Sequence, residues 1–328
     1  MVENLLEVSH LKKYFPIKSG VMRRTVGHVK AVDDISFTIR KGHVFGLVGE
    51  SGCGKSTAGR TILRLLAPSD GKIRFQGQDI TTLSRKELKK FRTKMQIIFQ
   101  DPYSSLNPRL PVSEIVGEAM LQHGIVANKK EMQDRVVAVI EKCGLFPEQS
   151  TRYPHQFSGG QRQRICIARA LAVNPEFIVC DEAVSALDVS IQSQIINLLK
   201  DMQQEMHLSY LFISHDLSVV KFISDDVGVM YLGQIVETGS KEQIFNNPLH
   251  PYTEALLYAV PLFDPEINRT RKRVLLEGDI PSPANPPSGC RFHTRCLYCR
   301  DVCREQIPES REVEAGHIVM CHKVNGVF

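Results

Sequence analysis

A glycine-rich segment, GESGCGKST, runs from Gly49 to Thr57 and carries the most specific chemical pattern in the sequence. It continues an apolar run typical of a buried strand, VFGLVGE, and precedes a helical pattern, AGRTILRLL. Glycines let the backbone wrap closely around a bound group, so that its N–H groups point inward. The N-terminus of the following helix adds partial positive charge. The segment therefore predicts a phosphate-binding loop, in preference to an incidental glycine-rich turn.

Within this loop, we expect Lys55 to reach the β- and γ-phosphates of a nucleotide, Ser56 to bind Mg²⁺, and Thr57 to donate toward the α-phosphate. The predicted nucleotide contacts of the loop are Gly49, Ser51, Gly52, Gly54, Lys55, Ser56 and Thr57. Such a loop needs an acid for the metal, and the apolar strand pattern FIVCDE supplies one. We expect Asp181, at the strand end, to hold Mg²⁺ through water and Glu182 to polarise the attacking water.

A second glycine motif, FSGGQRQR at residues 157–164, opens a helical pattern shortly before the acidic strand. With this motif in place the sequence resembles the ABC ATPase family, whose signature is serine-glycine-glycine-glutamine. The signature residues here are Ser158, Gly159, Gly160 and Gln161. The resemblance implies that they bind the γ-phosphate of ATP held by a second subunit, so that each site is completed only when two subunits close.

Further marks of the family follow in order along the chain. By resemblance, Gln100 is the glutamine that contacts Mg²⁺ and the attacking water, and His215 is the switch histidine that contacts the γ-phosphate. Phe15 is the best match for the aromatic residue that stacks on adenine, with the adjacent Tyr14 as the alternative. Ala183 stands where such relatives usually have proline. Alanine makes the turn less rigid than proline would, and it leaves both acids in place. The D-loop of the family corresponds to Ser185, Ala186, Leu187 and Asp188.

Three longer segments, QDPYSSLNPR, SALDVSIQSQ and HPYTEALLYAVP, are similar to the ATPases of oligopeptide and dipeptide importers. This resemblance implies ATP hydrolysis that powers peptide import, at the cytoplasmic face of the inner membrane as a peripheral subunit. It also implies a paralogous ATPase as heterodimer partner, two transmembrane permease subunits and, indirectly, an extracytoplasmic peptide-binding protein. Nickel, glutathione and some sugar systems share the subfamily, and no residue of this sequence is expected to touch the cargo.

Thiols crowd the C-terminal tail, at Cys290, Cys296, Cys299, Cys303 and Cys321. In a reducing compartment, such a cluster of cysteines indicates a metal site in preference to disulfide bonds. The resemblance favours a four-iron four-sulfur cluster, with Cys299 as the extra thiol. Its ligands would be Cys290, Cys296, Cys303 and Cys321. Zinc on the same four ligands and thiols without metal remain the alternatives.

Composition narrows the class of protein. The 328 residues are 42% hydrophobic and 23% charged, which is typical of a globular chain, and the net charge of +5 is too small for a nucleic-acid-binding stripe. We expect a cytosolic protein, because no apolar run approaches the ~18 residues of a membrane span and the start lacks a signal-peptide pattern.

Two rival functions fit the sequence less well. A soluble ABC ATPase of DNA repair or ribosomes would add a long coiled coil or a second cassette, and this chain shows neither. A metal-regulated binding module would explain the tail, but not Lys55, Asp181, Glu182 and His215 together.

The elements that must position these residues alternate between strand and helix. LLEVSHL and DDISFTIR are expected to be strands with an exposed side, and KIRFQG a further short strand. VFGLVGE, FIVCDE and YLFISH are expected to be buried strands, as in a parallel sheet. SEIVGEAMLQHG and EMQDRVVAVIEKCG show helical spacing. The expected fold class is α/β: an ABC-type P-loop ATPase with a RecA-like core, an antiparallel β subdomain and a helical subdomain, plus a small Cys-rich extension.

Two boundaries are expected along the chain. The resemblance makes residues 101–156 the helical subdomain, which receives a coupling helix from the permease. Prolines between Pro251 and Pro287 break the periodicity of the tail. We therefore expect an ATPase domain over residues 1–247 and a C-terminal extension of the oligopeptide-transporter type, with its Cys cluster, over 248–328.

Overall fold

The computed structural model describes residues 3–20, 23–259 and 278–324, which belong to two compact units. Unit 1 comprises Met1–Leu5, Ile39–His43 and Thr82–Ile213. Unit 2 comprises Leu6–Thr38, Val44–Thr81 and Ser214–Phe328. The phosphate-loop segment therefore belongs to unit 2, and the acidic strand and the SGGQ motif belong to unit 1.

Three parallel strands form the sheet of unit 1, namely β6 (Met95–Ile98), β7 (Phe177–Asp181) and β8 (Ser209–Ile213). β7 lies in the middle and pairs in parallel with both neighbours. All five residues of β7 and of β8 are buried, as expected for the apolar runs FIVCD and SYLFI. The two buried strands predicted here are confirmed, and the register places Asp181 beside Ile213 at the carboxyl end of the sheet.

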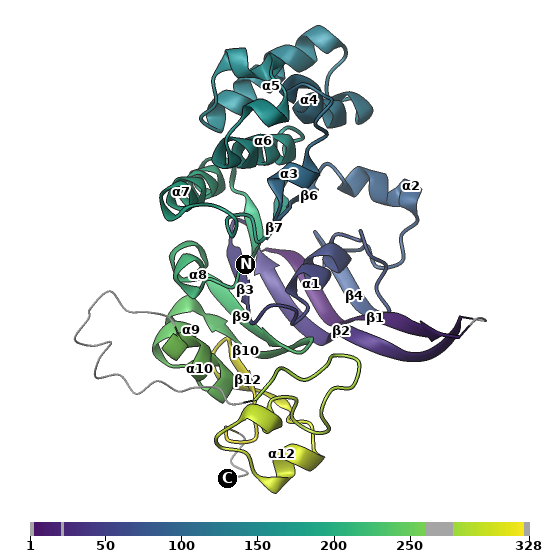
Figure 1. Cartoon of the computed structure of the whole chain (residues 1–328), viewed down its shortest axis with the longest axis vertical. Coiled ribbons are helices and arrows are strands. Elements are labelled where there is room, and N and C mark those ends of the chain that lie inside the picture. Colours follow the sequence, from purple (N-terminus) through teal and green to yellow (C-terminus); the bar gives the residue numbers. More distant parts are fainter. Residues whose placement is uncertain (1–2, 21–22, 260–277, 325–328) are drawn as a thin grey trace. The chain divides into compact units, whose positions relative to one another are not determined.

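The helices of unit 1 are α2 (Arg85–Leu88), α3 (Pro102–Ser105), α4 (Val112–Gln122), α5 (Lys129–Lys142), α6 (Gly159–Leu171) and α7 (Val189–Met206), with short 3₁₀ turns at Lys89–Phe91, Pro147–Thr151 and Pro154–Gln156. α4, α5 and α6 pack against one another (Figure 1). Their contact faces carry apolar residues at helical spacing, such as Met132, Val136 and Ile140 on α5. Both predicted helices of this region are therefore confirmed.

A four-stranded sheet of order β2-β1-β4-β5 lies almost wholly in unit 2. Its strands are β1 (Asn4–Ser19), β2 (Arg24–Arg40), β4 (Asp70–Phe75) and β5 (Gln78–Asp79). β4 pairs antiparallel with both β1 and β5. Buried and exposed residues alternate along the second half of β2, so one face of this strand packs on the core, as its sequence predicts.

A second group of strands in unit 2 positions the phosphate loop. β3 (Val44–Val48) is wholly buried and pairs in parallel with β9 (Asp226–Tyr231). β10 (Gln234–Ser240) pairs antiparallel with β9, and β12 (His317–Met320) pairs antiparallel with β10 and with β11 (Ser310–Glu314). The hairpin β9–β10 was not predicted from the sequence; Leu232 and Gly233 between its strands both have positive φ, as a tight hairpin turn requires.

The described helices of unit 2 are α1 (Lys55–Ile62), α8 (Leu217–Ile223), α9 (Lys241–Asn246), α10 (Pro251–Ala259) and α12 (Asp301–Glu305), with a 3₁₀ turn at His293–Arg295. α8 packs on β3 and α9 packs on β10 (Figure 1). The motif HPYTEALLYAVP starts one residue before α10, and its last two residues, Val260 and Pro261, lie outside the described part.

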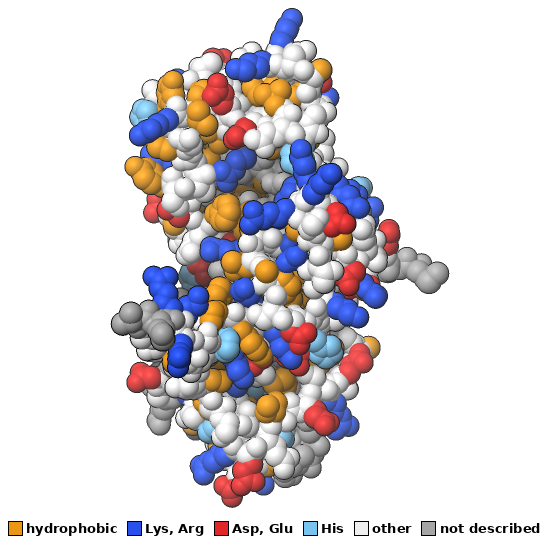
Figure 2. Space-filling model, turned by 90° about the vertical axis from the view of Figure 1, so that its right-hand side faces the viewer, with side chains coloured by type: hydrophobic (Ala, Val, Ile, Leu, Met, Phe, Trp, Pro, Cys, Tyr) orange, Lys and Arg blue, Asp and Glu red, His pale blue; other side chains and the backbone are white. Residues whose placement is uncertain are grey.

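Within the described residues, none of the helices combines the length and apolar character needed to span a bilayer. Figure 2 shows basic and acidic side chains both spread over the face it draws.

Candidate active site

The segment Gly49–Thr57 forms a tight loop between β3 and the start of α1 (Lys55–Ile62). Gly49 and Gly54 have φ values of 150° and 110°, which side chains rarely adopt. A Cβ atom on Gly54 would lie 2.0 Å from the carbonyl oxygen of Ala31, and one on Gly49 would lie 2.1 Å from that of Met230. Only glycine therefore allows this loop to pack so closely against the neighbouring backbone.

Lys55 is the first residue of α1 and is only 4% exposed. Its ammonium group donates to the carbonyl oxygens of Gly49 at 2.7 Å and Glu50 at 3.0 Å, so the lysine closes over the loop that precedes it. Ser56 and Thr57 follow in the first turn of the helix, where N–H groups and the helix dipole favour an anion. The loop can thus present positive charge and backbone donors to a phosphate group.

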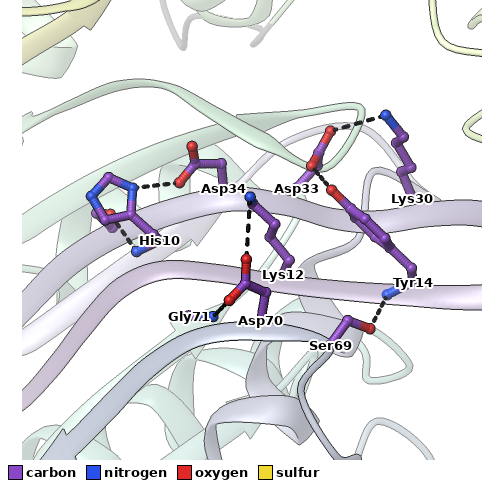
Figure 3. Close-up of polar contacts among 10 residues, drawn as sticks. His10, Lys12, Tyr14, Lys30, Asp33, Asp34, Ser69, Asp70 and Gly71 are labelled. Atoms are coloured by element: carbon purple, nitrogen blue, oxygen red, sulfur yellow. Dashed lines mark hydrogen bonds and ion pairs between the residues drawn. The ribbon is translucent and has the colours of Figure 1, made fainter.

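The two adjacent aromatic residues of β1 differ in their surroundings. The hydroxyl of Tyr14 donates to the carboxylate of Asp33, and its backbone N–H donates to Ser69 Oγ at 2.9 Å (Figure 3). Burial and the bond to Asp33 raise the pKa of Tyr14 well above its usual range. Phe15 is 36% exposed, with Lys13 Nζ 4.9 Å from the centre of its ring. Of the two rings, that of Tyr14 is thus tied to the protein by its hydroxyl group.

His215 lies in the short connection between β8 and α8, and its side chain is exposed. The next residue, Asp216, caps α8 by accepting from the backbone N–H groups of Ser218 at 2.8 Å and Val219 at 3.3 Å. The backbone N–H of Asp216 in turn donates to Ser214 Oγ at 3.0 Å. These bonds on both sides of the histidine fix the backbone that carries it.

The two acids after the buried strand of unit 1 have different environments. Asp181 ends β7 and is 1% exposed, whereas Glu182 is partly exposed and its carboxylate accepts from Gln100 Nε2 at 2.8 Å. The backbone of Glu182 has a φ of 49°, a conformation uncommon outside glycine, and its N–H donates to Ile213 O at 3.0 Å. The structure thus brings Gln100 and Glu182 together, from positions 82 residues apart.

The SGGQ motif stands at an exposed helix start in unit 1. Ser158 is the N-cap of α6, and it forms a capping box with Gln161, with N···O distances of 3.0 and 3.3 Å. The D-loop residues Ser185, Ala186, Leu187 and Asp188 occupy the turn before α7. Ser185 donates from its N–H and its Oγ to the carbonyl oxygen of Glu182, at 3.2 and 3.0 Å, so this turn also fixes the acid.

The C-terminal cysteines divide into two groups. Cys290, Cys296, Cys303 and Cys321 line one small cavity in unit 2, together with His293 and His322, whereas Cys299 is not among the lining residues. Burial raises the pKa of Cys290 to about 12 and that of Cys296 to about 11. Among the described residues, no group of three or more His, Cys, Asp or Glu side chains is arranged to hold a metal ion. The expected cluster or zinc site is therefore not confirmed.

The sequence analysis gave no role to Glu50, which occupies a variable position of the phosphate-loop pattern. In the structure its carboxylate forms an ion pair with Arg295, from the Cys-rich tail. No local pattern signals this contact, because the partners are 245 residues apart.

Comparison with known proteins supports the resemblance. A family model described as ABC transporter matches residues 32–185, and one described as oligopeptide/dipeptide transporter, C-terminal region, matches residues 236–303. The oligopeptide transport ATP-binding protein AppF of Bacillus subtilis is 54% identical, over 98% of this chain and 97% of its own. The putative oligopeptide transport ATP-binding protein YkfD of the same organism is 53% identical, over 97% and 95%.

Solved structures agree with these relatives. A dimeric post-hydrolysis state of the ATP-binding cassette MJ0796, bound to ADP and Pi, is 26% identical with a TM-score of 0.65. It covers 72% of this chain and 98% of its own. The predicted fold class and ATPase activity are confirmed. The chain therefore belongs to the ABC transporter family, among the ATP-hydrolysing subunits whose C-terminal region is of the oligopeptide/dipeptide transporter type.

Proposed function

We propose that this chain hydrolyses ATP to power the import of oligopeptides or dipeptides, with Lys55 at the centre of its nucleotide site. The observation that carries the proposal is the loop Gly49–Thr57, whose left-handed glycines and buried lysine form a phosphate cradle at the start of α1. Peptide as cargo is supported by relatives named oligopeptide transport ATP-binding proteins and by the match of the C-terminal region.

The roles of the other residues follow from their chemistry. Ser56 and Asp181 would hold Mg²⁺, the latter through water, and Gln100 would contact the metal and the attacking water. Glu182 orients that water, and its bond to the Gln100 amide supports the joint role, since both groups would then act on the same water molecule. His215 contacts the γ-phosphate, and Phe15 stacks on adenine; the exposure of its ring supports this choice over the less exposed Tyr14, whose hydroxyl bonds Asp33.

The exposed start of α6 supports a role between subunits. Ser158, Gly159, Gly160 and Gln161 are proposed to bind the γ-phosphate of ATP on a second subunit, with the D-loop beside it. We propose a paralogous ATPase as that second subunit, with two permease subunits in the membrane and an extracytoplasmic peptide-binding protein beyond them. The chain then works at the cytoplasmic face of the inner membrane. Its ATPase domain is proposed over residues 1–247, with the helical subdomain at 101–156 and the extension at 248–328.

A pair of variants tests the catalytic assignment. Glu182→Gln keeps the size of the side chain but removes the charge that orients water, so it should retain ATP binding and abolish turnover. Lys55→Ala should instead weaken nucleotide binding, which equilibrium binding of a fluorescent ATP analogue measures. Wild-type turnover by the Gln variant, in the assembled complex with its permease, would refute the role of Glu182.

We further propose that the four cysteines lining one cavity hold a four-iron four-sulfur cluster, an electron-accepting group bound by thiolates. The fit rests on the lining, which includes these four thiols and excludes Cys299. Among the described residues no ligand group already converges as a metal ion would require, so the proposal rests on the lining alone. A single zinc ion needs all four sulfurs at about 2.3 Å, whereas a cluster presents a separate iron atom to each.

Anaerobic purification tests this proposal by colour and by metal analysis, independently of activity. The protein should be brown and contain iron and sulfide, and Cys290→Ser or Cys321→Ser should bleach it, while Cys299→Ser should keep the colour. Colourless protein with stoichiometric zinc would assign the cavity to zinc, and colourless protein without metal would contradict both.

A further inference from the structure

Glu50 is held in place by the C-terminal part of the chain. Its two carboxylate oxygens accept hydrogen bonds from Arg295, Nη1 to Oε2 at 2.7 Å and Nη2 to Oε1 at 3.0 Å. This is a bidentate, charge-assisted pair, which is among the stronger and more directional interactions that side chains make. The pattern G-x-x-x-x-G-K-[ST] leaves this position open to any residue, so phosphate binding itself does not explain the acid.

The backbone of Glu50 is held as well as its side chain. Its N–H donates to the hydroxyl oxygen of Tyr252 in α10 at 2.9 Å, and its carbonyl oxygen accepts from Lys55 Nζ at 3.0 Å. Each polar group of Glu50 therefore has a partner, and two of these partners, Tyr252 and Arg295, lie beyond residue 248. The other two partners, Cys53 and the lysine that is to bind phosphate, both donate to the carbonyl oxygen of Glu50, at 3.3 and 3.0 Å.

Burial makes the pair of Arg295 and Glu50 specific. The side chain of Arg295 is 6% exposed and that of Glu50 is 23% exposed, so water competes weakly for the hydrogen bonds. Phe292, three residues before Arg295, packs against both Tyr231 and Tyr252. The segment that carries Arg295 is thus packed against the aromatic residues of β9 and α10.

We propose that Arg295 is a positioning residue of the nucleotide site, acting through Glu50 to hold the phosphate loop in the conformation that binds nucleotide. The inference rests on the proposed nucleotide site at Lys55. It makes the segment between Cys290 and Cys296 part of the ATPase machinery, because loss of the pair removes one restraint on Glu50, whose carbonyl oxygen accepts from the lysine ammonium. Nucleotide affinity then depends on the C-terminal extension, although the extension supplies no group that touches the nucleotide.

A double-mutant cycle on the full-length chain tests the proposal, with binding of fluorescent ADP as the readout. Arg295→Gln and Glu50→Gln each remove one charge of the pair and should each weaken ADP binding by about fivefold or more. The double variant should bind ADP no more weakly than whichever single variant has the lower ADP affinity, because either change alone already breaks the ion pair. Arg304→Gln is the matched control, since Arg304 lies in the same tail with a 64% exposed side chain, and it should bind ADP as wild type does.

Thermal unfolding without nucleotide separates positioning from mere stability. If Arg295→Gln lowers the unfolding temperature but leaves ADP affinity unchanged, the arginine only stabilises the fold and the inference is overturned. Additive losses in the double variant would also overturn it, because the two residues would then act independently. Should Arg295→Gln fail to fold, Glu50→Gln carries the same test.

Lys55→Ala separates this inference from the proposed site. Normal ADP binding by Lys55→Ala would refute the nucleotide site itself. Lost binding in that variant, together with wild-type affinity in Arg295→Gln, would refute only the positioning role.

Discussion

The phosphate loop offers a stringent test of the geometry, because two of its glycines share a positive φ but differ in their surroundings. Gly52 has a φ of 79° and Gly54 a φ of 110°. A Cβ atom on Gly52 would meet nothing within 4 Å, whereas one on Gly54 would lie 2.0 Å from Ala31 O and 2.9 Å from the methyl carbon of Met230. Alanine at the first position therefore adds backbone strain alone, and alanine at the second adds strain and a backbone clash.

The expected magnitudes follow from these two terms. For Gly52→Ala, the cost of a left-handed non-glycine residue is about 1–2 kcal/mol. For Gly54→Ala, strain of about 1–3 kcal/mol adds to overpacking of about 1–3 kcal/mol, giving about 2–6 kcal/mol in all. The clash is with a backbone oxygen, which cannot turn away as a side chain can, so we expect the upper half of that range.

Urea unfolding of the nucleotide-free chain, followed by circular dichroism, measures the difference between the two variants. Gly54→Ala should lose clearly more unfolding free energy than Gly52→Ala, and the start of α1 with Lys55 should be displaced. Equal losses in both variants would refute the reasoning, since they would show that the loop does not pack against Ala31 as the structure has it.

Two further predictions follow from other contacts. Phe15→Ala should weaken ATP binding by about 1–3 kcal/mol, the usual free energy of a base stacked on an aromatic ring, and Tyr14→Ala should weaken it less. Equilibrium titration with ATP measures both losses. A larger loss for Tyr14→Ala would show that adenine stacks on Tyr14 instead. The side chain of Glu237 is fully buried, and it accepts from His317 Nε2 at 2.8 Å and from the N–H groups of Leu249 and His250. Removing this carboxylate leaves its partners buried and unpaired, so Glu237→Ala should lower the free energy of unfolding by about 3–5 kcal/mol. The exposed Glu314→Ala, on β11, should cost under about 0.5 kcal/mol in the same urea assay, and equal losses would contradict the role of the buried pair.

Much of the chemistry could be predicted from short stretches of sequence. The loop around Lys55 and the acids after FIVC are local patterns, and each is flanked by an apolar run that can only be a buried strand. The hairpin β9–β10 was missed because its turn, Leu232-Gly233, lacks the asparagine or aspartate that usually marks such turns. The preference for Phe15 over Tyr14 comes from the resemblance and stays a prediction; the sequence gives no sign that the Tyr14 hydroxyl meets Asp33.

The sequence by itself determined the family, the fold class and the residue types expected to handle phosphate, because these depend on glycines, a lysine and acids at fixed spacing along one segment each. Only the tertiary structure shows that the four cysteines chosen by resemblance line a common cavity and that Arg295 forms an ion pair with Glu50. Residues 245 positions apart become neighbours only through the packing of α10 and the tail against the strands that carry the loop. Such contacts depend on the summed burial of Tyr231, Tyr252 and Phe292, and no spacing rule encodes that packing.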